Sequence, residues 1–187
     1  KNKLAIEKTP GVEDLVTEAF TGDDGLTLVE LSAFGVLGSI TPVTNPTETI
    51  INNTISAIAG GNSIVFCPHP SAKNISIWVI QFINKIISEA GGPKNLVTSS
   101  SEAKKENADI LFSHEKINML VVTGGTEIVK LALKSGKKVI GAGAGNPPVI
   151  VDETADIQKA ARDIVNGASF DNNLPCTAEK EVLVLEI

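Results

Sequence analysis

Short apolar runs alternate with helical stretches along most of this chain, and this alternation constrains the fold more than any other feature. The runs 34–40 (FGVLGSI) and 63–67 (SIVFC) have the length of buried strands, and each precedes a turn and a helical pattern. The same order returns at 118–122 and 137–141. Strand, short loop, helix and strand again is typical of βαβ units. The sequence therefore predicts an α/β fold, a parallel sheet with helices on both faces.

Local signals mark the ends of the expected helices. Asn45 and Pro46 suit the N-cap and first turn of a helix that ends at Ala59. Ser71 is expected to cap a long helix that ends before Gly91. Further helices are expected over 102–113, 126–134 and 156–167, and further strands over 26–31, 95–98, 148–151 and 181–185. Residues 1–25 show no clear pattern beyond a turn at 21–25.

Composition excludes several classes of partner. A net charge of −6 argues against a basic face for nucleic acid, and the absence of Tyr argues against a stacking platform for single strands. The longest uncharged run, 49–72, is interrupted by Asn, Gly and Pro, so it predicts no membrane span. The first residues lack an initiator Met and a signal-peptide core, and the chain stops within a strand pattern. We therefore expect a piece of a longer chain.

Two cysteines, Cys67 and Cys176, lie far apart and form neither a metal spacing nor a redox pair. They indicate free thiols in a reducing cytosol, hence a cytoplasmic protein without a metal. Cys67 and His69 form a C-x-H pair with no further ligand nearby, so Cys67 is expected in the core and His69 in a loop near a ligand. Cys176 follows Pro175, where the backbone must turn. A thiol there could face a cleft as a nucleophile or could be buried as a small apolar group.

Three loops follow expected strands, and in an open parallel sheet ligands bind at this edge. They are 41–46, 68–70 and 123–126. The turn 123–126 (TGGT) opens a helix, so its N–H groups could hold a phosphate, although its glycines could equally serve tight geometry alone. The glycine run 141–145 leads into a strand and not a helix, so it is better suited to a close backbone approach than to a phosphate.

Taken together, five segments resemble the aldehyde dehydrogenase superfamily. Within it they are similar to the CoA-acylating aldehyde dehydrogenases of ethanolamine and propanediol utilisation. The resemblance covers nearly the whole chain, and its order and spacing match. The segments are FGVLGSITPVTNPTETIIN (34–52), GNSIVFCPHPSAK (61–73), VVTGGTEIVKLAL (121–133), GAGAGNPPVIVDETADI (141–157) and NNLPCTAEKEV (172–182).

The resemblance implies roles for individual residues. Cys176 would be the nucleophile that attacks an aldehyde and becomes a thioacyl-enzyme. The oxyanion would be held by the Cys176 backbone N–H and the amide of Asn45; a gapless count places Thr44 there, and helix capping is the other role open to Asn45. The remaining residues would bind the cofactor: Thr123, Gly124 and Gly125 a phosphate, Thr41 and Pro42 the nicotinamide half, His69 the ribose or CoA, together with Gly143.

Departures from the family pattern favour CoA over water as the acyl acceptor. Hydrolytic relatives keep a water-activating glutamate about where this chain has Ala142, and no carboxylate occurs from 137 to 151. A thioester without such a base can wait for the thiol of CoA. The Lys and Glu that bind the adenosine ribose in many hydrolytic relatives are also absent, with Cys67 and Pro70 near those positions.

The resemblance therefore implies a CoA-acylating aldehyde dehydrogenase that uses NAD and coenzyme A on a short-chain aldehyde. It implies a Rossmann-like cofactor-binding domain over 1–170, incomplete at its N-terminus, and the start of a catalytic domain over 171–187. A homo-oligomer, microcompartment shell proteins and a place inside a bacterial microcompartment are family expectations. A hydrolytic NAD(P)-dependent aldehyde dehydrogenase and a non-catalytic nucleotide-binding module are the alternatives.

Overall fold

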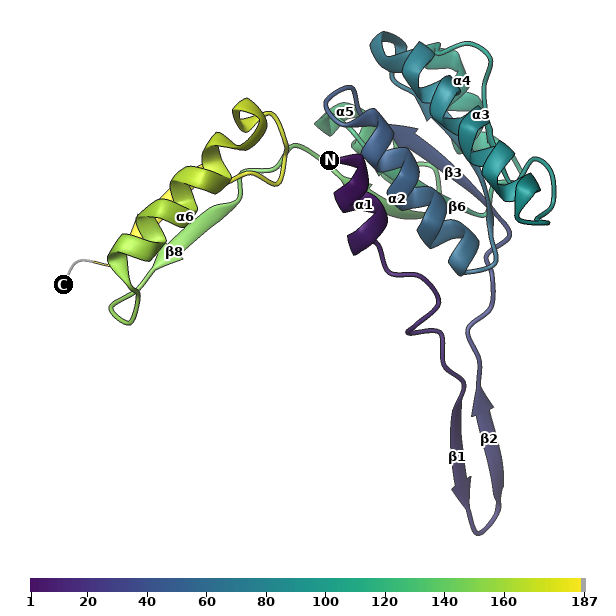
Figure 1. Ribbon diagram of the computed structural model, residues 1–187. Helices are drawn as coiled ribbons and strands as arrows, with labels where there is room; N and C mark the ends of the chain where they lie inside the picture. The colour runs from purple at the N-terminus through teal and green to yellow at the C-terminus, as the bar shows by residue number, and fades with distance from the viewer. Residues whose placement is uncertain (186–187) are drawn as a thin grey trace. The chain divides into compact units, whose positions relative to one another are not determined.

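The computed structural model describes residues 1–185 and divides the chain into two compact units. The first unit is 1–141 and the second begins at Ala142. Figure 1 shows the elements of both, and each unit is described by itself. No helix in the described part of the chain combines the length and apolar character that a membrane crossing needs.

A five-stranded sheet in the order β5-β4-β3-β6-β7 forms the centre of the first unit. The pairs β3–β4, β3–β6 and β4–β5 are parallel, which confirms the predicted α/β fold. The strands are β3 (Val36–Thr41), β4 (Ser63–Pro68), β5 (Val97–Ser99), β6 (Met119–Thr123) and β7 (Lys138–Ala142). The helices between them are α2 (Pro46–Ala59), α3 (Lys73–Glu89), α4 (Lys105–Ser113) and α5 (Thr126–Leu133).

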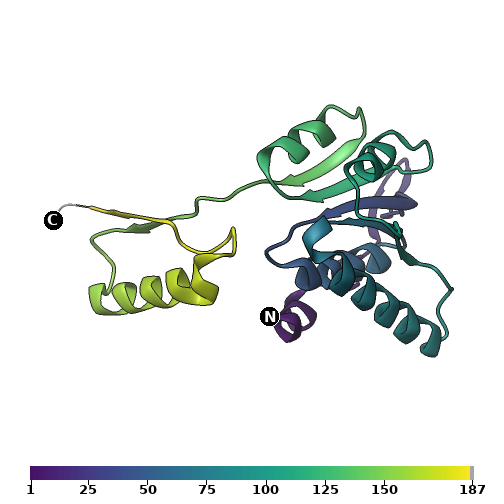
Figure 2. The same cartoon turned by 90° about the horizontal axis from the view of Figure 1, so that it is seen from above.

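Helices cover both faces of this sheet, as the sequence predicts (Figure 2). Successive strand side chains alternate between faces, so Phe66 packs with α2 and α3 while its neighbour Cys67 packs with α4 and α5. Ile50 of α2 and Val79 of α3 join the first cluster. Two apolar clusters, one on each face, therefore hold the strand ends in fixed register.

The strand order places a topological switch point at β3. From β3 the chain moves outward through β4 to β5, and then α4 returns it across the sheet to β6 on the other side of β3. The loops after β3 and β6 consequently leave the sheet in opposite directions, which opens a crevice between them. Crevices of this kind are where doubly wound sheets bind ligands.

The N-terminal segment contains one helix and one strand that the sequence did not predict, and one strand that it did. A short helix, α1 (Asn2–Lys8), packs against α2, and β1 (Glu18–Gly22) pairs antiparallel with β2 (Gly25–Val29). The expected turn at 21–25 is the turn of this hairpin. The strand expected over 26–31 is confirmed as β2, whereas α1 and β1 were not expected. Every residue of β1 is exposed, so this strand has no buried face to produce a clear apolar pattern.

Two predicted helix starts are wrong. Ser71 does not cap the long helix; it lies within a 3₁₀ turn, η1 (Pro70–Ala72), and α3 begins after Ala72, which makes no side-chain cap bond. Helix α4 begins at Lys105 and not at 102, because Ser100 Oγ and Asn107 Nδ2 both donate to the Glu102 carbonyl and hold a loop there.

The second unit is a βαβ element. Strand β8 (Pro148–Val151) pairs in parallel with β9 (Glu181–Val184), and α6 (Ile157–Ser169) and η2 (Phe170–Asn173) connect them. Asp156 caps α6 by accepting a hydrogen bond from the Lys159 N–H at 3.0 Å. The compact units divide at Gly141, whereas the predicted domains divide at 170/171. Because β9 pairs with β8, the thiol segment shares its unit with residues from 142 onward.

Candidate functional site

A cavity of about 240 Å³ lies at the switch point of the first unit. It is formed by the ends of β3, β4 and β6 together with α4 and α5. The structure brings together here the residues predicted on three separate loops: Thr41, Pro42, His69, Thr123, Gly124 and Gly125. The three loops thus meet at one edge of the sheet, as expected, while the ligand-binding roles of these residues stay predictions.

The turn after β6 is shaped to admit an anion. Gly125 occupies the N-cap position of α5, and no side chain caps the helix. A Cβ on Gly125 would meet nothing within 4 Å, whereas a Cβ on Gly124 would lie 2.8 Å from Ile128 Cγ2. Gly124 therefore allows close packing of α5, and Gly125 leaves open space before uncapped N–H groups. Such a helix N-terminus favours a phosphate.

Thr41 supplies evidence that the cavity suits a polar ligand. The residue is 1% exposed, and its hydroxyl finds no hydrogen-bond partner among the described residues. A buried hydroxyl without a partner is costly. A nucleotide in this cavity would offer acceptor and donor groups where the protein leaves one unsatisfied.

His69 has a structural role in addition to its place in the cavity lining. Its Nδ1 accepts a hydrogen bond from the Ser71 N–H at 3.2 Å, which caps η1. With Nδ1 accepting this bond, Nε2 is the ring nitrogen that is left to donate. The Nε2–H makes no bond among the described residues, so it is free to donate to a ligand.

Asn45 stands at the N-cap position of α2, yet its side chain does not cap the helix. Asn45 Oδ1 accepts from the Thr44 hydroxyl at 2.9 Å, and its carbonyl accepts from the Thr49 N–H and hydroxyl. The amide Nδ2 donates no hydrogen bond within the described chain. The capping role is thereby excluded, and a donor remains available. Asn45 does not line the cavity described above.

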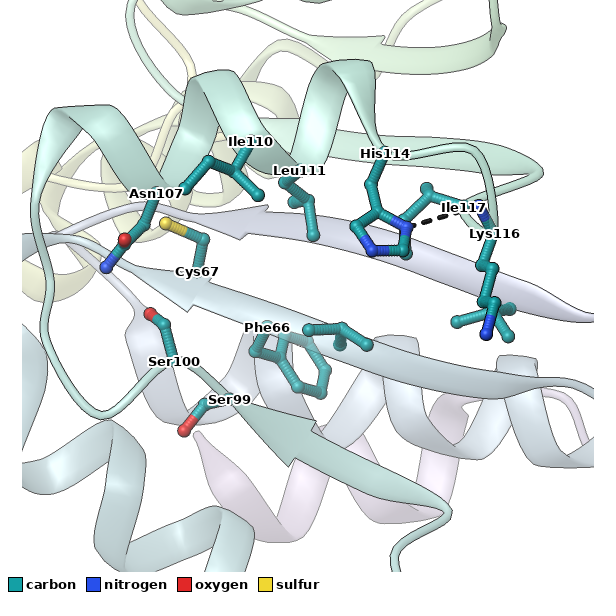
Figure 3. Close-up of a pocket in the computed structure, with 12 residues that line it drawn as sticks. Phe66, Cys67, Ser99, Ser100, Asn107, Ile110, Leu111, His114, Lys116 and Ile117 are labelled. Carbon is teal, nitrogen blue, oxygen red and sulfur yellow. Dashed lines mark hydrogen bonds between the residues drawn. The ribbon is translucent and has the colours of Figure 1, made fainter.

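Cys67 is a core residue, as predicted. It is 6% exposed, and burial raises the pKa of its thiol, an effect that a hydrogen bond with Ser100 opposes. Cys67 also lines both the switch-point cavity and a second cavity of about 400 Å³ under α4. Figure 3 shows Cys67, Ser100 and Asn107 at one end of this second cavity and His114 at the other, with His114 Nδ1 accepting from the Lys116 N–H.

Cys176 lies in the second unit, in a turn closed by the Ala178 N–H and the Pro175 carbonyl at 3.2 Å. The thiol is free and the residue is half-buried, so the predicted turn at Pro175 is confirmed. The Cys176 N–H donates no hydrogen bond among the described residues. A thiol and a free backbone donor therefore stand on the same residue.

Polar bonds set the shape of the loop that leads into Cys176. Asp171, Asn172 and Asn173 all have positive φ, a conformation that Asn and Asp tolerate better than other residues with a Cβ. Asn173 Nδ2 donates to the carbonyls of Ala168 at 2.6 Å and Glu179 at 3.0 Å. Lys180 Nζ donates to the carbonyls of Asn173 and Pro175. Hydrogen bonds made by Asn173, which precedes Cys176, and by Lys180, which follows it, thus fix the turn.

The glycine run approaches this turn at Gly145. A Cβ there would lie 2.2 Å from the Cys176 carbonyl oxygen, so only glycine fits. The run therefore permits a close backbone approach, as the sequence predicts. The cofactor residue selected from the run is Gly143, where a Cβ would meet nothing within 4 Å. Its predicted role is a proposal only.

The sequence did not identify several residues of the site. Lys104, Ala108 and Ile128 line the switch-point cavity but lie on α4, α5 or the loop before α4, away from the strand ends. The strand order would have indicated that helices line the cavity, since α4 crosses the sheet at the switch point. Gly145 was visible within the glycine run, but its partner, Cys176, is far away in the sequence.

Comparisons with known proteins place these features in a family. Residues 5–187 match the family described as "Aldehyde dehydrogenase family". The CoA-propanoylating propanal dehydrogenase of Salmonella typhimurium is 59% identical over 186 residues, 100% of this chain and 40% of that protein. The acetylating acetaldehyde dehydrogenase of Escherichia coli is 51% identical over 187 residues, with the same coverage.

Solved structures agree. The propionaldehyde dehydrogenase of Rhodopseudomonas palustris, with bound CoA and an acylated cysteine, superposes with a TM-score of 0.92 at 59% identity and covers 98% of this chain and 42% of its own. A propionaldehyde dehydrogenase from the Clostridium phytofermentans fucose utilisation bacterial microcompartment gives 0.92 at 56%, covering 97% and 42%. This chain thus spans about two fifths of the length of the four relatives named above.

Proposed function

This chain belongs to the aldehyde dehydrogenase family, and we propose that the intact protein is a CoA-acylating, NAD-dependent aldehyde dehydrogenase. The observation that carries the proposal is the contact of Gly145 with the Cys176 backbone. The segment that approaches the thiol turn is thus the one without a carboxylate from 137 to 151. A thioacyl group there lacks a water-activating base from that segment and can await a thiol.

In this reaction the Cys176 thiolate attacks the aldehyde carbonyl carbon and forms a thiohemiacetal. The carbonyl oxygen gains negative charge, and the N–H of Cys176, which makes no bond among the described residues, would donate to it. Asn45 Nδ2 is the second donor that we propose. Its Oδ1 is held by the Thr44 hydroxyl, so the amide is oriented and its N–H bonds remain available.

The residues of the switch-point cavity fit a dinucleotide. Gly125 and the first turn of α5 would hold a phosphate, while Thr41, Pro42 and His69 would contact other parts of the molecule. We include Gly143 among the cofactor contacts as a proposal. When bound, NAD⁺ accepts the hydride lost by the thiohemiacetal carbon, and CoA supplies the thiol that takes the acyl group.

Deacylation returns Cys176 to its starting state. Attack of a thiolate on the thioester carbonyl forms a new carbon–sulfur bond, and the bond to Cys176 Sγ breaks with its electron pair left on the thiolate. The balanced reaction converts aldehyde, CoA and NAD⁺ into acyl-CoA, NADH and one proton. The same oxyanion donors serve both steps, because both pass through a tetrahedral centre on Cys176.

Substrate, assembly and location follow as parts of the proposal. The named relatives act on propanal or acetaldehyde, which supports a short-chain aldehyde. One solved relative comes from a bacterial microcompartment, which supports a cytoplasmic location inside such a compartment, with shell proteins as partners. We also propose a homo-oligomer, and a catalytic domain that begins within 171–187 after a cofactor-binding domain over 1–170.

Hydrolysis to the free acid is the competing function, because two carboxylates follow Cys176 closely. Glu181 accepts from Asn146 Nδ2 at 3.3 Å, and the Glu179 carboxylate lies against Gly167. Neither contact brings a carboxylate to the thiol within the described residues. The acylating reaction is therefore the better-supported one.

Replacement of the thiol tests the proposal. In the intact protein Cys176→Ala should abolish aldehyde-dependent NADH formation, because no other described thiol lies in that unit. Asn166→Ala, at an exposed position of α6 in the same unit as Cys176, is the control and should keep most of the activity. Substantial activity in the Cys176→Ala protein would refute the proposed mechanism.

A further inference from the structure

The end of β4 lacks the group that normally selects NAD⁺ over NADP⁺. In dinucleotide folds a carboxylate near this point of the sheet binds the ribose hydroxyls and repels a phosphate there. Here the strand ends with Cys67 and Pro68, and His69 and Pro70 follow. Among the described residues that line the cavity, none carries a carboxylate. Nothing in that lining therefore rejects a phosphorylated ribose.

A cation lies in the same lining. Lys104 reaches the cavity from the loop between β5 and α4. Ser100 Oγ donates to the Glu102 carbonyl at 2.8 Å, and Asn107 Nδ2 donates to the same oxygen. These two bonds hold the backbone of the loop that carries Lys104 against the first turns of α4.

Lys104 has a partner that a ligand could replace. Its Nζ lies 2.5 Å from the Glu102 carboxylate, with 62% and 57% of the two side chains exposed. An exposed pair of this kind contributes little stability. A phosphomonoester carries a charge of about −1.5 to −2 and three acceptor oxygens, so it is a stronger partner for an ammonium group than one carboxylate.

Resting on the proposed function, we propose that Lys104 recognises a phosphomonoester on the adenosine ribose of the bound nucleotide. The lining that lacks a carboxylate admits the phosphate, and Lys104 neutralises it. Two ligands carry this chemistry: NADP⁺ on its 2′-oxygen and CoA on its 3′-oxygen. Glu102 opposes both by competing for the ammonium group, which makes the loop 100–104 the determinant of nucleotide selectivity.

Two pairs of nucleotides isolate the phosphate in the intact protein. NADP⁺ and NAD⁺ differ only by the 2′-phosphate, and CoA and dephospho-CoA only by the 3′-phosphate. Dissociation constants are measured by calorimetry for the wild type and for Lys104→Gln, Glu102→Gln and Lys94→Gln. Lys94 is an exposed lysine outside the cavity lining, so its variant controls for net charge.

We expect Lys104→Gln to lower the preference for the phosphorylated member about fivefold to tenfold in at least one pair, and to leave NAD⁺ binding within about twofold. Glu102→Gln should raise the same preference by roughly twofold to fivefold, because it removes the competitor. Lys94→Gln should change neither. The pair that responds identifies whether the phosphate is that of NADP⁺, of CoA or of both.

Two results would overturn the inference. If both preferences are unchanged in Lys104→Gln while NAD⁺ still binds and aldehyde still yields NADH, the inference fails and the proposed function stands. If no nucleotide binds the wild type, the proposed function fails and the inference with it. Circular dichroism spectra of the variants, all with exposed sites of substitution, check that each protein is folded.

Discussion

The switch-point cavity and the thiol turn are built by different means. The cavity rests on two apolar clusters, with Phe66 and Leu120 fully buried on opposite faces of the sheet. In the second unit the buried hydrophobic residues of the described chain are Val151 and Ala178, and Cys176 is held by backbone and side-chain hydrogen bonds. Burial thus shapes the switch-point cavity, whereas polar bonds and one glycine contact hold the thiol turn.

This difference predicts how substitutions should affect the switch-point cavity and the thiol turn. Hydrophobic burial is non-directional and spread over many residues, so the cavity loops depend on the stability of the whole sheet. Hydrogen bonds are directional and few, so the thiol turn depends on individual groups. We therefore expect substitutions in the first unit to change folding stability, and substitutions around Cys176 to change reactivity more than stability.

The largest effect on stability is expected from Phe66→Ala in the intact protein. Phe66 is 0% exposed, and removal of a buried phenyl ring costs about 3–5 kcal/mol in the free energy of unfolding. Urea unfolding measures this loss. Phe170→Ala in the second unit is the control, because Phe170 is 53% exposed and should change stability by no more than about 0.5 kcal/mol. Equal losses would contradict the contrast in packing.

Gly145→Ala should give the next effect, on catalysis. The added methyl would overlap the Cys176 carbonyl oxygen at 2.2 Å, so the turn must shift. A displacement of about 1 Å at a reacting group can lower the rate on the order of a hundredfold. The measurement is the rate of the NADH burst. Gly22→Ala is the control, because Gly22 lies in the exposed strand β1 and a Cβ there meets nothing within 4 Å. The account is wrong if the two variants lose activity equally.

A smaller effect is expected from Asn173→Gly. The substitution keeps the positive φ that this position requires but removes the amide that joins the Ala168 and Glu179 carbonyls. Each lost hydrogen bond is worth about 0.5–1.5 kcal/mol, which corresponds to a rate loss of roughly tenfold if the turn loosens. Stopped-flow measurement of acylation checks this. Asn166→Ala, on the exposed face of α6, should leave the rate unchanged.

The smallest effect concerns the two thiols. Burial raises the pKa of Cys67, so its thiolate is scarce at neutral pH and a thiol reagent should label it late and only at alkaline pH. The folded thiol keeps its proton above the ordinary thiol pKa while the unfolded one loses it, so the contribution of Cys67 to stability falls as the pH rises through that range. Mass spectrometry after timed iodoacetamide labelling should find Cys176 modified first. Earlier labelling of Cys67 would contradict the burial assigned to it.

The fold could be predicted because its signals are local. The strands β3, β4 and β6 are short apolar runs bounded by turn residues, and α2 begins at Asn45 and Pro46 as expected. The strand β1 was not predicted, since its residues are all exposed and leave no pattern, whereas β2 matches the strand expected over 26–31. The start of α4 was misplaced because the bonds of Ser100 and Asn107 to Glu102 are made by side chains, which a periodic pattern does not reveal.

The candidate site could be predicted only in part. Thr41, His69 and Gly125 follow strands, so topology alone brings them to one edge of the sheet. Lys104 does not follow a strand end of this edge, so its place in the cavity lining could be predicted only from the order of the strands in the sheet. The pairing of Gly145 with Cys176 depends on how α6 returns the chain to β8, a feature of tertiary structure.

The most direct test of the central claim is NADH formation by the intact protein from a short-chain aldehyde, with and without CoA. Without CoA we expect a burst of about one NADH per active site and then no further product, because the thioacyl group on Cys176 waits for a thiol. Addition of CoA should restore turnover and yield acyl-CoA. Continued NADH formation with release of the free acid in the absence of CoA would contradict the account.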